Sequence, residues 1–147
     1  NVLNGGAAYY RCYATADAGY VALGPIEPQF FATLLEHLGL TDDSRFAKQY
    51  DPDAQDEMQS ALEHLFASKV RSEWEAILTQ VDACFAPVLS MTEAPDHPHN
   101  IARGTFVETD GVVQPAPVPR FVGTPSDAPT HGDAGKIAFD EVMKRWD

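Results

Sequence analysis

The stretch AYYRCYATADAGYVALGPIEPQFF, residues 8–31, combines the pattern of a β-hairpin with the beginning of a helix. Strand-forming residues lie on both sides of the turn-forming residues 16–19, which predicts two antiparallel strands. A helix is predicted from Pro28, because proline is preorganised for the first helical position. The apolar residues that follow have the spacing of an amphipathic helix as far as Gly39, where we expect the helix to end.

The middle of the chain is predicted to be helical. Apolar residues at helical spacing predict one helix that passes through Met58 and Phe66. Ser72 and Glu75 form the pattern of a capping box, which predicts the start of a further helix at that point. The apolar run 83–89 then predicts a short buried strand.

The last third of the chain is predicted to contain a second hairpin and an irregular connection. The Asp-Gly pair at 110–111 favours a two-residue type I′ turn between two short strands. We therefore expect an α+β domain over residues 1–114, with a small antiparallel sheet, hairpins and a helical middle. A Pro/Gly-rich linker is predicted at 115–135 and a C-terminal helix at 136–147, which is apolar enough to need a partner surface outside the chain.

Composition limits the classes of protein that fit. The chain has 147 residues, of which 44% are hydrophobic and 22% are charged, as is usual for a folded domain, and no apolar run approaches the ~20 residues of a membrane helix. There are 22 acidic and 10 basic residues, a formal charge of −12, with no local basic cluster. Nucleic acid is therefore an unfavourable partner, and the phosphates of any anionic ligand must be bound mainly elsewhere.

The chain begins with neither methionine nor a signal-peptide pattern, and we interpret it as part of a longer protein. Its two cysteines, Cys12 and Cys84, lie among apolar or aromatic residues and lack the CxxC spacing of a zinc or redox motif. They are predicted to be buried free thiols of a cytoplasmic protein.

Glu27 is the residue that points most directly to chemistry. With Pro28 at the first helical position, Glu27 falls on the N-cap, where Ser, Thr, Asp and Asn are preferred. The helix dipole favours its ionised form, so it could accept a hydrogen bond from an imidazole and fix its orientation. The alternative is an exposed acid with no role beyond that favourable position.

Other candidates are weaker. His97 and His99 suggest a metal site, but no third ligand follows at a fixed spacing, so solvated loop histidines are favoured and no metal is expected. Strand tyrosines, among them Tyr10, could line an apolar pocket or serve only in sheet packing.

Several ordered motifs resemble the racemase branch of the class III CoA-transferase (CaiB/BaiF) family. They are NVLNGGAAYYRCY from residue 1, GPIEPQFF from residue 24, DACFAPVL from residue 82, HPHNIARGTF from residue 97 and PVPRF from residue 117. Together they cover nearly the whole chain. The chain resembles the small domain and C-terminal return of such an enzyme, closest to α-methylacyl-CoA racemases.

The resemblance implies an isomerase that interconverts (R)- and (S)-2-methylacyl-CoA thioesters through an enolate, in fatty acid metabolism. The acyl-CoA is then the substrate and no separate cofactor is expected. The resemblance also implies an interlocked homodimer whose large domain, not present in this chain, holds the catalytic His and Asp bases and the CoA phosphates. Glu27 would support the His base of the partner subunit, and Tyr10 and Ile26 would line the acyl end of the pocket. The chain alone is expected to be inactive.

Two alternatives remain open. One is a class III CoA transferase that moves CoA between carboxylic acids, although the glycine-rich lid loop of the formyl-CoA branch is not visible in the sequence. The other is a non-catalytic dimerisation module, which would have no need for a glutamate at a helix N-cap.

Overall fold

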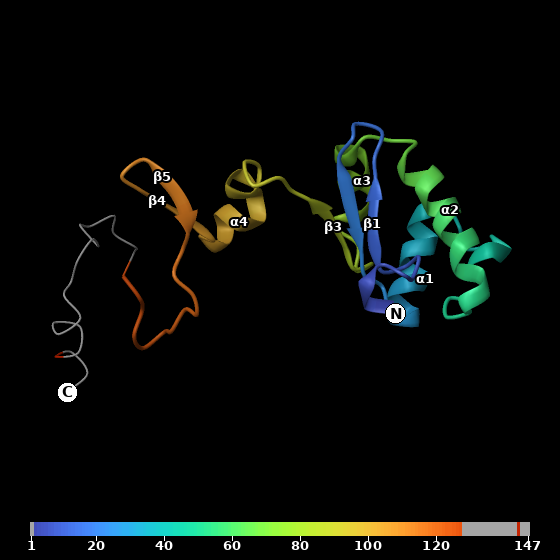
Figure 1. The fold of residues 1–147 in the computed structure, drawn as a ribbon, viewed down its shortest axis with the longest axis horizontal. Helices are drawn as coiled ribbons and strands as arrows, with labels where there is room; N and C mark the ends of the chain where they lie inside the picture. The colour runs from blue at the N-terminus through green and yellow to red at the C-terminus, as the bar shows by residue number, and fades with distance from the viewer. Residues whose placement is uncertain (1, 128–143, 145–147) are drawn as a thin grey trace. The chain divides into compact units, whose positions relative to one another are not determined.

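The computed structural model describes residues 2–127 and residue 144. The chain divides into two compact units, Asn1–Leu89 and Ser90–Asp147, and each is described by itself (Figure 1). Both units combine short helices with antiparallel strands, so the predicted α+β class is confirmed. No helix in the described part of the chain has the length and hydropathy of a membrane span. The division predicted at residues 114–115 and 135–136 remains a prediction.

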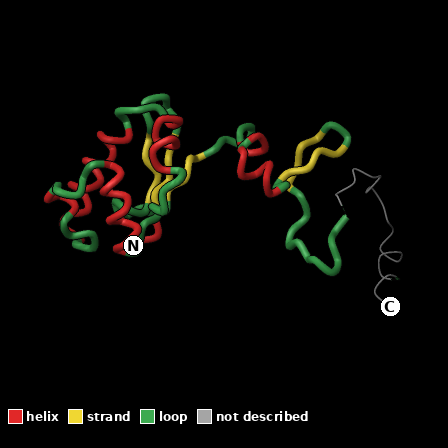
Figure 2. The backbone as a smooth tube through the Cα atoms, turned by 180° about the vertical axis from the view of Figure 1, so that it is seen from behind, coloured by secondary structure: helices red, strands yellow, loops and turns green. Residues whose placement is uncertain are grey.

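The first unit is built on a three-stranded antiparallel sheet in the order β1-β2-β3. Its strands are drawn in yellow in Figure 2. Strands β1 (Arg11–Ala14) and β2 (Tyr20–Leu23) form the predicted hairpin. Strand β3 (Phe85–Val88) pairs with β2 from far along the chain, so that Ala22 lies between Cys12 and Ala86. Its proline, Pro87, is tolerated because β3 is an edge strand.

Three helices accompany this sheet: α1 (Pro28–Leu38), α2 (Gln55–Phe66) and α3 (Arg71–Leu78). The short 3₁₀ helices η1 (Val2–Asn4), η2 (Ser44–Phe46) and η3 (Pro52–Ala54) complete the unit. Helices α1 and α2 lie to one side of the strands in both views (Figures 1 and 2). Helix α1 begins at Pro28 and ends at Gly39 in the left-handed conformation, as the sequence predicts.

The core lies between the sheet and the helices. At its centre the Tyr13 ring stacks on Phe66, with centroids 5.3 Å apart, and Phe66 meets Trp74 edge-on at 5.0 Å. The Trp74 indole N–H donates to the Phe66 carbonyl at 2.9 Å, so the ring is buried without losing a hydrogen bond. Every buried hydrophobic residue of the described chain lies between Ala7 and Ala83, which places the core wholly in the first unit.

The start of α3 differs from the prediction. The helix begins at Arg71, with Val70 as N-cap, and the Glu73 carboxylate accepts the Val70 N–H at 3.2 Å. The predicted capping box at Ser72 and Glu75 is therefore wrong. The reason is tertiary: the hairpin turn reaches the helix start, where the Asp17 carboxylate accepts the Arg71 N–H at 3.2 Å.

The prediction that the cysteines are buried is also wrong. Cys12 and Cys84 are both exposed, and both are free thiols. The side chains of β1 and β3 alternate between a face packed on the helices and an outer face that is open, and Cys12 lies on the open one. Likewise, β3 is not the buried strand that its composition suggests, because exposed residues alternate with half-buried ones along it.

The second unit contains η4 (Ala94–Asp96), α4 (Pro98–Arg103) and the hairpin β4 (Phe106–Thr109) with β5 (Val112–Pro115). Asp110 and Gly111 have φ values of 53° and 77°, the positive values that a type I′ turn requires, so the predicted hairpin is confirmed. The Arg120 guanidinium donates to the carbonyls of Arg103 and Gly104 at the end of α4. Residues 116–127 form no helix or strand, and the helix predicted at 136–147 lies outside the described residues.

Candidate functional site

Glu27 occupies the N-cap of α1, as predicted. Its backbone is extended, with φ −73° and ψ 141°, and its carbonyl accepts the N–H groups of Phe30 and Phe31 at 3.1 Å. The side chain is exposed and makes no capping hydrogen bond to the helix. The carboxylate thus lies near the positive end of the helix dipole and is able to accept a hydrogen bond from another molecule.

The segment before Glu27 is fixed on two sides by hydrogen bonds. On the sheet side, the Gly24 N–H donates to the Cys84 carbonyl at 2.9 Å. On the other side, the connection between α1 and α2 supplies two donors: the Gln49 amide reaches the carbonyls of residues 25 and 26, and the Tyr50 hydroxyl reaches the Ile26 carbonyl at 2.7 Å. Glu27 therefore follows a segment whose backbone is well determined.

Tyr10 lies beside this segment. A Cβ atom placed on Gly24 would be 3.7 Å from Cε2 of Tyr10, so the ring packs over the glycine. Tyr10 also lines an open hollow of about 540 Å³ on the outer face of the sheet, together with Cys12, Cys84 and neighbouring residues of η1, β2 and β3. The structure thus brings Tyr10 and the segment that carries Glu27 together, although they are separated in sequence by the hairpin.

Ile26 has a different environment. Its side chain is half-buried and packs against the core of the first unit, and its carbonyl accepts the hydrogen bonds described above. The clearest structural contribution of Ile26 is therefore to anchor the chain immediately before Glu27.

The carboxylate of Glu27 acts electrostatically on the edge of the hollow. Partial desolvation by its neighbours raises the pKa of the Cys84 thiol, and the negative charges of Glu27 and then Asp82 raise it further. Cys84 lines the same hollow as Tyr10, and so does Gly24, three residues before Glu27. Chemically, the arrangement offers a fixed negative charge beside an apolar surface.

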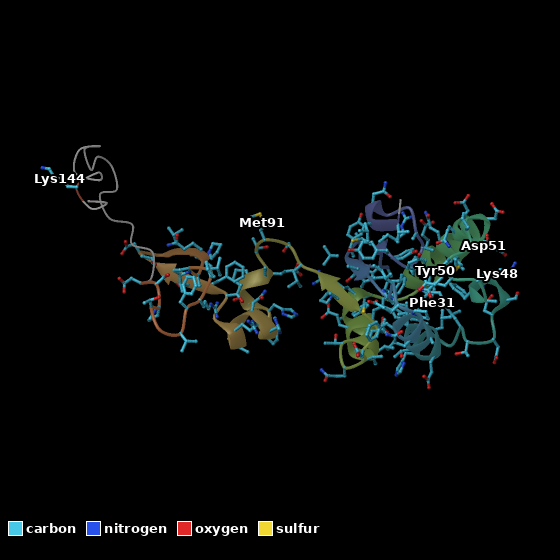
Figure 3. The ribbon with its side chains drawn as sticks, turned by 90° about the horizontal axis from the view of Figure 1, so that it is seen from below. Phe31, Lys48, Tyr50, Asp51, Met91 and Lys144 are labelled. Atoms are coloured by element: carbon cyan, nitrogen blue, oxygen red, sulfur yellow. The ribbon has the colours of Figure 1, made fainter. Side chains whose placement is uncertain are left out.

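A second open hollow, of about 500 Å³, lies between α1 and the connection that follows it. Phe31 contributes to its lining from the helix, and Tyr50 lies beside the Lys48–Asp51 pair of the connection, whose N–O distance is 3.6 Å (Figure 3). Tyr50 contributes its hydroxyl to the Glu27 segment and its ring to this hollow, so the two features share one side chain.

The histidines in the described part of the chain lie in or at the start of three different helices. His97 is the N-cap of α4 and His99 lies within that helix, whereas His37 and His64 bond the carbonyls of Thr33 and Ser60 within their own helices. Among the described residues there is no group of three or more His, Cys, Asp or Glu side chains arranged to hold a metal ion.

Comparison with known proteins agrees with the motifs. Alpha-methylacyl-CoA racemase of Homo sapiens is 40% identical to this chain over 127 residues, which are 86% of the chain and 33% of the racemase. The racemase of Mus musculus is 43% identical over 119 residues, which are 81% of the chain and 31% of that protein. The chain therefore spans about a third of the length of each relative.

The fold matches a solved structure as well. The crystal structure of Rv3272 from Mycobacterium tuberculosis has a TM-score of 0.64 and 21% sequence identity, covering 83% of this chain and 37% of that one. At this identity the match concerns the fold alone. Residues 2–135 match the family described as CoA-transferase family III. The chain belongs to CoA-transferase family III.

Proposed function

We propose that this chain is the small-domain part of an acyl-CoA racemase, which interconverts (R)- and (S)-2-methylacyl-CoA thioesters by removing and returning the α-proton through an enolate. The observation that carries the proposal is the identity of 40–43% to two alpha-methylacyl-CoA racemases over more than four fifths of the chain. The exposed carboxylate of Glu27, which makes no capping hydrogen bond to α1, gives the proposal a site.

In this reaction Glu27 is a positioning group rather than the base. Its carboxylate accepts an N–H from the imidazole of a histidine base on the partner subunit. A negative charge at hydrogen-bonding distance raises the pKa of the imidazole and fixes which of its nitrogens faces the substrate. Both effects favour proton transfer by a histidine near neutral pH. The positive end of the helix dipole is a favourable position for this negative charge.

The apolar hollow supports a site for the acyl group. Tyr10 lies in its lining together with Phe85, Arg11 and several small or aliphatic residues. We propose that Tyr10 contacts the acyl end of the thioester, with Ile26 contributing through the loop that it anchors. The acyl-CoA is the substrate and no further cofactor takes part.

The proposal includes a larger assembly. The remaining two thirds of the protein supply the CoA-binding domain and the two bases, and two subunits interlock so that Glu27 of one faces the histidine of the other. The formal charge of −12 on this chain supports a separate location for the CoA phosphates. A cytoplasmic enzyme of fatty acid metabolism is consistent with this chemistry.

The test uses the full-length protein, meaning this chain together with the part that corresponds to the rest of the racemase relatives. Glu27→Gln should lower the rate of C2 deuterium exchange from D2O roughly 30- to 1,000-fold, because an orienting charge of this kind contributes on the order of 2–4 kcal/mol to the transition state. Glu36→Gln, at an exposed position of the same helix, is the matched control. Wild-type exchange in Glu27→Gln, with both enantiomers as substrate, would contradict the proposed role.

A CoA transferase is the second candidate, favoured by the match to CoA-transferase family III. Such an enzyme requires an acceptor carboxylic acid and produces a new thioester. A racemase exchanges the C2 proton with no acceptor acid present. Incubating the full-length protein with an acyl-CoA, with and without a second acid, and separating the thioesters distinguishes the two reactions.

A further inference from the structure

We propose that Gln49 is a positioning residue for Glu27, an inference that rests on the proposed function. Gln49 lies in the connection between α1 and α2, and the residue is only 9% exposed. Its amide nitrogen donates to the Pro25 carbonyl at 3.0 Å and to the Ile26 carbonyl at 2.9 Å. One buried amide thus fixes two successive peptide groups, and the second of them is the peptide that joins Ile26 to Glu27.

The two hydrogen bonds restrict the backbone from which the Glu27 side chain extends. A peptide group is planar, so holding its carbonyl oxygen also holds the nitrogen of the following residue. Rotation of the Ile26–Glu27 peptide would turn Glu27 about the start of α1, and the Gln49 amide opposes that rotation. The Tyr50 hydroxyl donates to the same Ile26 carbonyl at 2.7 Å, so this oxygen has two donors.

Gln49 is itself held by a second glutamine. The Gln55 side-chain nitrogen donates to the Gln49 carbonyl at 2.8 Å and to the Asp51 carbonyl at 2.9 Å. The Gln55 side-chain oxygen accepts the Ala8 N–H at 3.0 Å. The two glutamines therefore connect the backbone near Tyr10 with the backbone before Glu27. The proposed site requires these two segments to keep their positions relative to each other.

An amide is the side chain suited to this location. The Pro25 and Ile26 carbonyls need donors because Pro25 is buried and Ile26 half-buried, and an unpaired buried carbonyl is costly. A lysine would supply donors but add a buried positive charge close to Glu27. The neutral Gln49 amide fills the hydrogen-bonding need and leaves the charge of Glu27 available to a partner.

The test compares three variants of the full-length protein. Gln49→Met keeps the approximate length of the side chain and removes both donors. Tyr50→Phe removes only one donor to Ile26 and keeps the ring, so it provides a milder variant should Gln49→Met fail to fold. Gln59→Met is the matched control, because Gln59 donates to Glu63 on the surface of α2.

If Gln49 acts through Glu27, Gln49→Met lowers kcat for C2 deuterium exchange about 10- to 100-fold, since small displacements of a catalytic group have effects of this size. KM stays within about twofold because no substrate contact is lost. Tyr50→Phe gives a smaller loss, and Gln59→Met none. The decisive measurement is the double variant Glu27→Gln/Gln49→Met, whose rate should match that of Glu27→Gln within about twofold. Independent losses that multiply in the double variant would overturn the proposal.

A second measurement separates this inference from the proposed function. Amide hydrogen exchange of the peptide 24–31, followed by mass spectrometry, needs no catalytic activity. Gln49→Met should raise the exchange of this peptide at least tenfold while the peptides of α3 remain as in the wild type. If Glu27→Gln proves fully active, the racemase role of Glu27 fails, and this measurement still decides whether Gln49 holds the segment. Unchanged protection of residues 24–31 in Gln49→Met would overturn the positioning role.

Discussion

Glu27 shows how a residue poorly suited to local structure can indicate a function. Asp, Asn, Ser and Thr are good N-caps because their short side chains fold back onto the first amides of the helix. A glutamate at this position has a longer side chain, and that of Glu27 makes no capping bond to α1. The helix therefore lacks one stabilising interaction, and the carboxylate is exposed at the start of α1.

The ionisation of Cys84 provides a test of the charge at this point. Although Cys84 is exposed, partial desolvation by its neighbours raises the pKa of its thiol most, and the Glu27 and Asp82 carboxylates raise it further. Only the thiolate is alkylated rapidly, so a higher pKa means slower reaction at pH 8. Glu27→Gln removes a negative charge and lowers the pKa of Cys84. We therefore expect faster alkylation of Cys84 at pH 8 in Glu27→Gln, with the pH–rate curve displaced toward lower pH.

The measurement is the rate of iodoacetamide labelling from pH 7 to 10 in a Cys12→Ala background, which leaves Cys84 as the only thiol. Glu36→Gln serves as control, because its carboxylate is not among the groups that raise the Cys84 pKa. The displacement should be partial, since desolvation is the larger cause. Identical curves for wild type and Glu27→Gln would show that the carboxylate is too distant to act on the hollow.

At the scale of elements, the parts of the fold with local causes could be predicted from sequence. The Asp-Gly pair at 110–111 requires positive φ at both positions, and Pro28 with Gly39 sets the limits of α1. The N-cap position of Glu27 could be predicted for the same reason, since it depends on only a few neighbouring residues. The start of α3 could not be found in this way, because a turn carboxylate from a distant hairpin contributes to it.

The parts of the site that depend on distant pairing were missed. Cys12 is exposed because it lies on the open face of the sheet, and Cys84 is exposed immediately before β3, a strand that pairs from far along the chain. Gln49 donates to the carbonyls of Ile26 and Pro25, which lie 23 and 24 residues away in the sequence. No sequence motif predicts such partners for a glutamine in a loop. The role of this buried amide could be recognised only from the three-dimensional structure.

The N-cap of α1 also allows a prediction about the helix as an element. Glu27→Asp replaces a side chain that makes no capping bond with one of the best N-caps. The shorter carboxylate should turn back onto the amides of the first helical turn and stabilise the chain by about 0.5–1 kcal/mol. The same movement withdraws it from any partner imidazole, so C2 exchange by the full-length protein should fall at least tenfold, by analogy with the loss of other supporting groups.

Thermal unfolding of the chain and deuterium exchange by the full-length protein, measured on Glu27→Asp, check both parts. A stabilised and less active variant supports a carboxylate directed outward for function. A variant that is both less stable and fully active would contradict the prediction. It would show that the length of the side chain at position 27 does not affect the exchange reaction, and that an aspartate there is as effective as the glutamate.

At the scale of the whole molecule, the core, the sheet and the segment before Glu27 all belong to the first unit. The same unit carries the Glu27 carboxylate and the hollow that Tyr10 lines. Both remain open to solvent on the outer side. A proton-transfer site must exclude water around its charged groups. The chain spans about a third of the racemases it resembles, and the proposed large domain and partner subunit would close the site.

The last prediction concerns this chain on its own, which should neither bind CoA tightly nor exchange the C2 proton of an acyl-CoA. Its formal charge of −12 repels the phosphates of CoA, and its basic residues are scattered rather than gathered. In calorimetry we expect no saturable heat from CoA at concentrations up to about 1 mM, which corresponds to a binding free energy weaker than about −4 kcal/mol. The full-length protein under the same conditions is the control, and it should bind the ligand and exchange the proton. Micromolar binding by the chain alone would place the phosphate contacts here, and with them a larger share of the site than Glu27 and Tyr10.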